Sequence, residues 1–276
     1  MSALAARLRQ LRTQSGQPSS VAPQKSALSS DVLRLIQGRS RIQSMAQRAP
    51  SSDRMVPGVE ITPGLFLVET IMEWGRPTPM IDTAFARWDE PVAHHRLLHF
   101  DTETTGLAGG TGTRAWMIGA ANWLADGRFR LRQLTTTTMG AETAMLRTFA
   151  GWLQPDTVLV SYNGKSYDSP LLRTRFRLAR LPDPLLGLGH LDLLHPVRRR
   201  WKGAWENCRL ATAERELLSV VREDDLPGSE APAAWLTYLR GGSALNLRRV
   251  LAHNAQDLKS LAGVLLYMAK LAELPA

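Results

Sequence analysis

From residue 58 onward, short apolar segments alternate with turn formers along the chain. Residues 58–74 place apolar and β-branched side chains between turn formers, which predicts a small hairpin. Residues 96–103 are nearly all apolar until their last positions and predict a buried strand, followed by a Gly- and Thr-rich loop at 104–113. The folded part of the chain therefore opens with strands.

The pattern then changes from strand spacing to helical spacing. Residues 115–124 and 128–135 predict two strands joined at Asp126-Gly127, a dipeptide typical of tight hairpins. The remaining segments are an amphipathic helix at 141–153, a strand at 157–162, a helix at 169–180, a short strand or turn at 191–194, and largely helical chain from Arg209. This order predicts an α/β fold: a mixed sheet with an antiparallel meander of three strands plus one or more parallel strands, flanked by helices.

Residues 1–57 have a different character. Residues 13–31 are rich in Ser, Gln and Pro, and a short helical pattern lies on each side of them. We expect residues 1–57 to form a mostly disordered arm and residues 58–276 to form one folded domain, with 58–95 as its leading hairpin region.

The net charge of +9 is concentrated in this arm. Residues 1–57 hold nine Lys or Arg against two acidic side chains, a difference of +7 that leaves +2 for the rest. Such an arm can follow phosphates or an acidic partner, and a solvated tail explains it equally well. An Arg- and Ser-rich, acid-poor start is also typical of an organelle transit peptide.

Cysteine content and hydropathy narrow the class of protein. Cys208 is the single cysteine, which excludes an internal disulfide and a multi-cysteine zinc site, and we interpret it as an inert core residue. No run approaches the eighteen or so apolar residues of a membrane span, and the start lacks a secretory apolar region. We expect a cytoplasmic protein with no membrane partner.

Two carboxylates stand at the end of the strand predicted at 96–103. Asp101 and Glu103 are two residues apart in FDTETTG (100–106), so strand alternation places both on one face. Two unpaired acids beside a core repel each other, and a divalent cation with a preference for oxygen ligands neutralises them. The alternative is a polar strand end that caps the next loop with Thr104 and Thr105. We favour metal binding here.

Two further acids have credible structural roles of their own. Asp168 follows a Tyr-Asn-Gly turn at a predicted helix start, where Asp commonly complements free N–H groups. His253 and Asp257 are four apart on a predicted helix, where they can simply hydrogen-bond to each other. Only the conjunction of these residues with Asp101 and Glu103 points to one site, because neighbouring strand ends converge on one crevice.

Five segments together resemble the DnaQ-like (DEDD) 3′–5′ exonucleases of the ribonuclease-H-like superfamily, and most closely their bacterial YprB-type branch. They are FDTETTGLAGGTGTRAWMIG (100–119), LVSYNGKSYDSPLL (159–172), HLDLLHPVRRRWK (190–202), LATAEREL (210–217) and HNAQDLKSLA (253–262). The likeness runs from about Gly58 to near the C-terminus. It implies a ribonuclease-H-like fold and metal-dependent 3′–5′ exonuclease activity.

The resemblance also implies roles for individual residues. Two Mg²⁺ or Mn²⁺ ions would be held by the carboxylates, with Asp101 bridging, Glu103 and Asp257 on the nucleophile side, and Asp168 on the other ion. His253 would accept or direct the proton of the attacking water. Relatives with histidine usually place it five residues before the last Asp and those with tyrosine four, whereas His253 combines histidine with the spacing of four.

Substrate contacts are expected at two places. The resemblance places the backbone of Thr104, Thr105, Gly106 and Leu107 against the terminal nucleotide, and the glycines at 109, 110 and 112 permit close approach or form a flexible turn. Basic residues interleaved with tryptophan are the best candidate for phosphate contact and base stacking; they are Arg198, Arg199, Arg200, Trp201 and Lys202, with Trp205 nearby. We interpret Arg173, Arg177 and Arg180 as a solvated helix face, and His190 and Asp192 as hydrogen-bonding rather than ligating residues.

These expectations combine into a 3′–5′ exonuclease on DNA that acts in DNA repair. The alternatives are a DEDD-type ribonuclease on RNA and a non-catalytic nucleic-acid-binding adaptor. We also expect the arm to tether the enzyme to DNA or to a helicase-like partner.

Overall fold

A seven-stranded mixed sheet organises the part of the chain that the computed structural model describes, which is residues 51–75, 77–106, 111–222 and 226–272. Its spatial order is β1-β2-β7-β6-β5-β8-β9. The strands are β1 (Val59–Thr62), β2 (Leu65–Met72), β5 (Leu97–Thr104), β6 (Ala115–Trp123), β7 (Phe129–Thr136), β8 (Val158–Ser161) and β9 (Gly189–Asp192). A separate two-stranded sheet pairs β3 (Met80–Ile81) with β4 (Val92–Ala93).

The pairing confirms the predicted mixed sheet. Strands β5, β6 and β7 form the antiparallel meander, and β8 and β9 continue from β5 in parallel. The turn between β6 and β7 is the predicted Asp126-Gly127 hairpin, in which Gly127 has a φ of +86° and Leu124 N–H donates to Arg128 O at 2.7 Å. The predicted leading hairpin, β1–β2, extends this sheet, since β2 pairs antiparallel with β7 from Leu65 to Met72.

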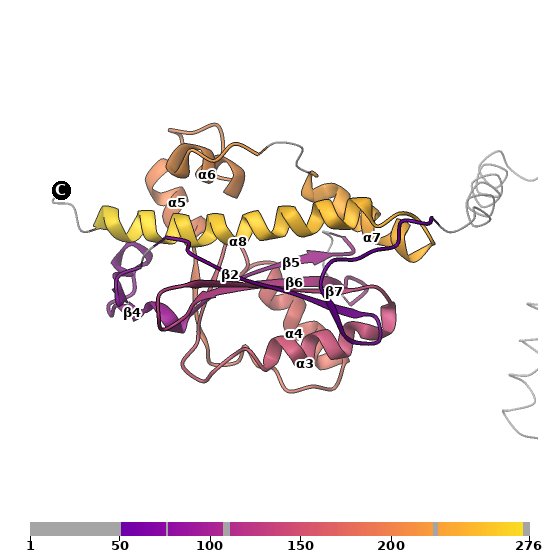
Figure 1. Cartoon of the computed structure of the whole chain (residues 1–276). Helices are drawn as coiled ribbons and strands as arrows, with labels where there is room; N and C mark the ends of the chain where they lie inside the picture. The colour runs from indigo at the N-terminus through magenta and orange to yellow at the C-terminus, as the bar shows by residue number, and fades with distance from the viewer. Residues whose placement is uncertain (1–50, 76, 107–110, 223–225, 273–276) are drawn as a thin grey trace, which may run out of the picture. The chain divides into compact units, whose positions relative to one another are not determined.

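Helices cover both faces of the sheet (Figure 1). Two of them, α3 (Glu142–Ala150) and α4 (Asp168–Leu178), lie on one face. The long helix α8 (Leu245–Ala272) runs across the other face, on the same side as α5 (Leu194–Trp201), α6 (Leu210–Leu218) and α7 (Ala231–Leu239). Four short 3-10 helices complete the described elements: η1 (Ala84–Ala86), η2 (His94–Arg96), η3 (Met139–Ala141) and η4 (Gly228–Glu230).

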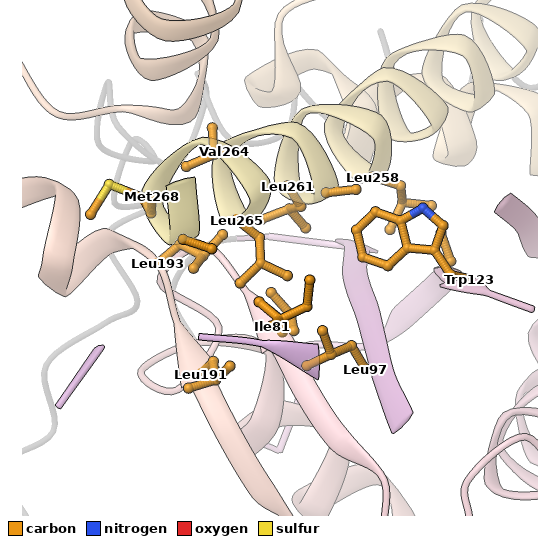
Figure 2. Close-up of a cluster of buried hydrophobic side chains, with 14 of the residues drawn as sticks. Ile81, Leu97, Trp123, Leu191, Leu193, Leu258, Leu261, Val264, Leu265 and Met268 are labelled. Atoms are coloured by element: carbon orange, nitrogen blue, oxygen red, sulfur yellow. The ribbon is translucent and has the colours of Figure 1, made fainter. Parts of the chain in front are cut away.

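Apolar packing fixes α8 on the sheet. Leu258, Leu261 and Leu265 recur at helical spacing and are buried over Leu97 and Trp123 (Figure 2). Each fully buried leucine contributes roughly 1.5–3 kcal/mol relative to an exposed one. This anchoring holds the preceding turns of α8, which carry His253, Asn254 and Asp257, above the middle of the sheet.

Residues that precede the first strand also contact the folded body. Ser51 N–H donates to Gly241 O at 2.8 Å, Arg248 forms an ion pair with Asp53 at 2.7 Å, and the guanidinium of Arg54 lies 3.6 Å from the centre of the Tyr238 ring. Residues 51–57, assigned to the arm from sequence, therefore pack on the body through the end of α7 and the start of α8. The predictions for residues 1–50 lie outside the described residues.

Candidate functional site

The side chains of Asp101 and Glu103 project from β5 toward α8. Asp101 pairs with Gly119 of β6, and its Oδ2 accepts a hydrogen bond from Nδ2 of Asn254 on α8 at 2.9 Å. Strand alternation places Glu103 on the same face, where only 8% of the residue is exposed. Glu103 is therefore buried, whereas Asp101 is partly exposed and contacts α8 through Asn254.

Asp168 reaches this strand from the first turn of α4. The turn before it uses Asn163 in the left-handed region, with a φ of +69°. Asp192, on β9, accepts hydrogen bonds from the N–H groups of Asn163 at 2.7 Å and Lys165 at 3.1 Å, which fixes the turn. The hydroxyl of Thr102 then donates to Oδ1 of Asp168, so the β8–α4 connection is tied to β5.

The third segment lies on α8, where His253 and Asp257 share one face. His253 Nε2 is 3.3 Å from Asp257 Oδ2, as the spacing predicts. Nη2 of Arg222 donates a hydrogen bond to Oδ1 of Asp257. Nη1 of the same side chain lies 3.1 Å from Nδ1 of His253. Because a guanidinium only donates, Nδ1 accepts in this contact and the ring proton lies on Nε2, facing Asp257.

Electrostatics show that the four carboxylates share one environment. The pKa of Asp101 is raised well above its ordinary value, first by burial and then by the charges of Asp257, Asp168 and Glu103. Burial raises the pKa of Asp168 to about 6. Burial also raises the pKa of Asp257, against the lowering effect of His253 and Arg222. A cation placed among these groups would be strongly stabilised.

The donor set fits hard divalent cations, because it consists of carboxylate oxygens with no sulfur. Within the described ranges, however, no group of three or more His, Cys, Asp or Glu side chains is already arranged as a metal site. Three of the carboxylates are engaged by separate donors: Asp101 by Asn254, Asp168 by Thr102 and Asp257 by Arg222. Binding of a cation by these carboxylates would require side-chain movement, including release of Asp257 by Arg222.

A buried hydrogen-bond network surrounds Asp101 and is not evident from the sequence. Asn254 Oδ1 accepts from Nε2 of Gln133 at 2.9 Å, and Gln133, Gly119 and Asp101 are cross-strand neighbours on β7, β6 and β5. A Cβ on Gly119 would lie 2.1 Å from Asn254 Oδ1, so only glycine leaves space for this amide. Asn254 immediately follows His253, but nothing local distinguishes it from a surface asparagine.

Arg222 and Glu214 were also missed. Glu214, on α6, is 1% exposed and accepts from Arg222 at 2.9 Å and from the hydroxyl of Ser260. Burial lowers the pKa of Arg222, but the hydrogen bonds and charges of Glu214 and Asp257 outweigh this effect and raise it, so this side chain carries a fixed positive charge beside the candidate ligands. Glu214 lies in the segment 210–217, which carries part of the family resemblance. This resemblance was the one feature of the sequence that could have indicated a role for Glu214.

A family model identifies the superfamily of this chain. The model described as the RNase_H superfamily matches residues 98–269, which is more than half of the chain and a range that contains all four carboxylates. The chain belongs to the RNase H superfamily. This confirms the superfamily inferred from the motifs, while the DEDD exonuclease branch within it stays a prediction.

Individual relatives of this RNase H superfamily member cover only parts of it. YprB of Bacillus subtilis (strain 168) is 37% identical over 181 residues, which are 64% of this chain and 42% of YprB. The family B DNA polymerase of Pyrobaculum calidifontis matches with a TM-score of 0.48 and 17% identity over 61% of this chain and 24% of that one. E. coli Exonuclease I in complex with a dT13 oligonucleotide matches with a TM-score of 0.36 and 15% identity, over 56% and 43%. The chain thus spans less than half the length of each.

The predicted nucleic-acid contacts of this RNase H superfamily domain lie in two places. Thr104 ends β5 and donates to Gly106 O at 2.9 Å, while Thr105 pairs through its backbone with Arg114. Leu107 and the glycines at 109 and 110 lie outside the described residues. The basic run is on α5 and just after it, where Arg198, Arg199, Arg200 and Lys202 are exposed and Trp201 stacks on Trp205 at 4.6 Å. The role of both places in binding stays a prediction.

His190 and Asp192 form structural hydrogen bonds. Asp192 accepts from backbone N–H groups of the turn before α4, and His190 Nε2 lies 2.7 Å from the hydroxyl of Ser161. Cys208 is partly buried against the core beneath α8. Within the described ranges, no helix is long and apolar enough to cross a membrane.

Proposed function

We propose that this protein is a metal-dependent 3′–5′ exonuclease that hydrolyses phosphodiester bonds of DNA and acts in DNA repair. The observation that carries the proposal is the environment of Asp101. Its partly buried carboxyl experiences the charges of Asp257, Asp168 and Glu103, and these acids come from three separate elements of an RNase H superfamily fold. Such a concentration of acid is costly for folding and is relieved by bound cations.

The residues that would hold two Mg²⁺ or Mn²⁺ ions are Asp101, Glu103, Asp168 and Asp257. When bound, the ions supply an activated water and stabilise the leaving oxygen of the phosphodiester. Asn254, Thr102 and Arg222 hold three of these carboxylates in place by hydrogen bonds. The protein therefore contributes anionic ligands whose side chains are held near one another, and Arg222 has to release Asp257 before a cation can take its place.

His253 is placed to orient Asp257. Its Nδ1 faces Arg222 and its Nε2 faces Asp257, so both ring nitrogens are engaged. To accept a proton from water, His253 has to release one of these contacts. The proposed primary role of His253 is thus positioning, with proton transfer following when Arg222 moves.

The test is cleavage of matched single-stranded and double-stranded oligonucleotides of DNA and RNA in Mg²⁺, Mn²⁺ or EDTA. Each strand carries a label at its 5′ end in one assay and at its 3′ end in another. We expect a ladder of 5′-labelled DNA that shortens one nucleotide at a time, immediate release of the 3′ label as mononucleotide, and no product in EDTA.

Other outcomes assign other functions. Preferential degradation of RNA would show that the substrate is RNA rather than DNA, with the same metal-dependent hydrolysis. Loss of nucleotides from the 5′ end, or internal cuts, would overturn the polarity. Binding of oligonucleotides without product in either metal would support a non-catalytic adaptor.

A further inference from the structure

A second cluster of charge lies on the opposite face of the sheet from the carboxylates. Arg130 and Arg132 are two apart on β7, so both side chains lie on one face. Arg132 pairs across the sheet with Ala120, which is part of the core beneath α3 and α4, whereas Asp101 faces α8. Both arginines line a cavity of about 360 Å³ together with Asn122, Trp152 and Arg96.

This cavity is separate from the carboxylate site along the strands as well. It is lined by Leu97 and Leu98 at the start of β5 and by Thr157 just before β8. Glu103 follows Leu98 by five residues, which corresponds to about 16 Å along an extended strand. The cavity is thus at the other end of the sheet.

Arg132 is buried without a complete set of partners. It is 6% exposed, its guanidinium lies 4.0 Å from the centre of the Trp152 ring, and in the described part of the chain its Nε has no hydrogen-bond acceptor. Its Nη2 reaches Asn122 Oδ1 only at 3.4 Å. Leaving a buried charged donor unsatisfied is costly, so an anion that contacts this guanidinium from the cavity would be favoured.

The charge of Arg132 is offset only in part by the fold, through its cross-strand neighbour Glu69 on β2. Among the described residues, no carboxylate forms an ion pair with Arg130 or Arg132, and the nearby Asp156 pairs with Arg96 at 3.1 Å. Arg130 donates to the same Asn122 oxygen as Arg132, at 3.3 Å. Burial and the charge of Arg130 lower the pKa of Arg132 to about 10, opposed by the exposed Glu69 on β2.

We propose that this cavity binds a phosphate group, carried by a ligand of up to mononucleotide size or by a nucleic-acid strand. Two neighbouring guanidinium groups offer several N–H donors in the fork geometry that matches phosphate oxygens. The cavity volume lies at the lower end of the range for small-molecule sites, which suits a phosphate with a small attached body. An incoming dianion would satisfy Arg132 and remove the repulsion between the two arginines. This proposal does not depend on the nuclease activity.

The experiment is calorimetric titration of the full chain in EDTA with inorganic phosphate, dTMP or a dT10 oligonucleotide, at constant ionic strength. We expect at least one of these probes to bind, and Arg132→Met to weaken that binding about tenfold or more through loss of charged hydrogen bonds. Glu69→Gln should tighten it, because it removes the nearest opposing charge. Arg128→Met is the matched control, since Arg128 is exposed in the hairpin and pairs with Asp126.

A second variant distinguishes loss of the binding site from misfolding of the protein. Arg130→Met removes the less buried of the two arginines and should weaken binding in the same direction, while circular dichroism and melting temperature report the fold. Binding of inorganic phosphate or dTMP identifies a small ligand as sufficient, and binding of dT10 alone identifies a strand. Absence of binding by all three probes, or equal affinity in the wild type and in both arginine variants, would overturn the proposal.

Discussion

At the residue scale, the site depends on the side-chain amide of Asn254, which α8 holds against the sheet. Asn254 donates to Asp101 and accepts from Gln133, and Gly119 provides the space beneath it. Residues that orient metal ligands typically contribute 10–100-fold in metal affinity or activity. Asn254 thus belongs to the proposed machinery without being a ligand.

We predict that Asn254→Ala and Gly119→Ala each weaken Mn²⁺ binding by roughly 10–100-fold. The first removes the donor to Asp101, and the second displaces Asn254 by steric overlap. Free Mn²⁺ measured by electron paramagnetic resonance during titration reports the affinity. Gly140→Ala is the control, because an added Cβ there has no atom within 4 Å. Unchanged affinity in both site variants would show that Asn254 does not position Asp101.

Buried histidine gives the fold a defined response to pH. His99 is fully buried on β5, and burial lowers its pKa from 6.5 to about 4. The folded protein therefore keeps His99 neutral at pH values where the unfolded chain already binds the proton. Above pH 6.5 His99 has no effect on how the free energy of unfolding depends on pH. As the pH falls from 6.5 toward 4, proton binding by the unfolded chain lowers the free energy of unfolding by up to about 3 kcal/mol.

We predict that His99→Leu flattens the decrease in the free energy of unfolding between pH 6.5 and pH 4.5. Urea denaturation of the metal-free protein at a series of pH values gives this slope. His95→Leu changes an exposed histidine and should retain the wild-type slope. Parallel curves for wild type and His99→Leu would contradict the assigned cause.

Residues of the candidate site differ in how far sequence could place them. Asp101 and Glu103 follow from strand alternation alone, because both are on one strand. Arg222 and Asn254 could not be assigned this way, because their partners lie 35 and 153 residues away along the chain. Such contacts depend on how α8 packs across the sheet, which local periodicity does not encode.

At the element scale, the connection from β8 to α4 sets the position of Asp168. Asn163 adopts a left-handed backbone conformation there, and its N–H donates to Asp192. Asparagine tolerates this conformation, whereas a β-branched side chain is strained in it.

We predict that Asn163→Val lowers the free energy of unfolding by about 1–2 kcal/mol and that Asn163→Gly leaves it nearly unchanged. Because the turn precedes Asp168, the valine variant should also lower metal-dependent activity. Urea denaturation and initial cleavage rates measure the two effects. Equal stability of the valine and glycine variants would show that a β-branched side chain is not strained at position 163.

Elements with strong local patterns were predictable, and those without them were not. The antiparallel meander could be predicted from the apolar runs and the Asp126-Gly127 turn, because both are local features of the sequence. Helix α5 was not predicted, because its sequence LHPVRRRW combines a proline with a basic run that we interpreted as a possible phosphate contact. The region after Arg209 was expected to be helical, but its division into α6, α7 and α8 depends on packing.

At the scale of the whole molecule, residues 1–57 remain the predicted tether to DNA or to a helicase-like partner. The structure refines how to test this, because Asp53 and Arg54 contact the body through Arg248 and Tyr238. A truncation should therefore end at residue 50.

We predict that removal of residues 1–50 weakens binding to long DNA, more so at low salt, while cleavage of short oligonucleotides is unchanged. The loss of basic side chains reduces the number of counterions released on binding. Fluorescence anisotropy over a salt series measures this, with melting temperature as the check on folding. Identical affinity and salt dependence, together with unchanged capture of a helicase partner, would contradict the tether.

The central claim is that Asp101 holds the cations that cleave the phosphodiester bond. Its most direct test compares Mn²⁺-dependent cleavage of 5′-labelled single-stranded DNA by wild type, Asp101→Asn and Asp126→Asn. Asp126 is a matched control, because it is a half-exposed hairpin carboxylate paired with Arg128. The account predicts a loss of about 100-fold or more for Asp101→Asn, since a missing ligand removes several kcal/mol of charge stabilisation, and full activity for Asp126→Asn. Wild-type turnover by a folded Asp101→Asn variant would contradict it.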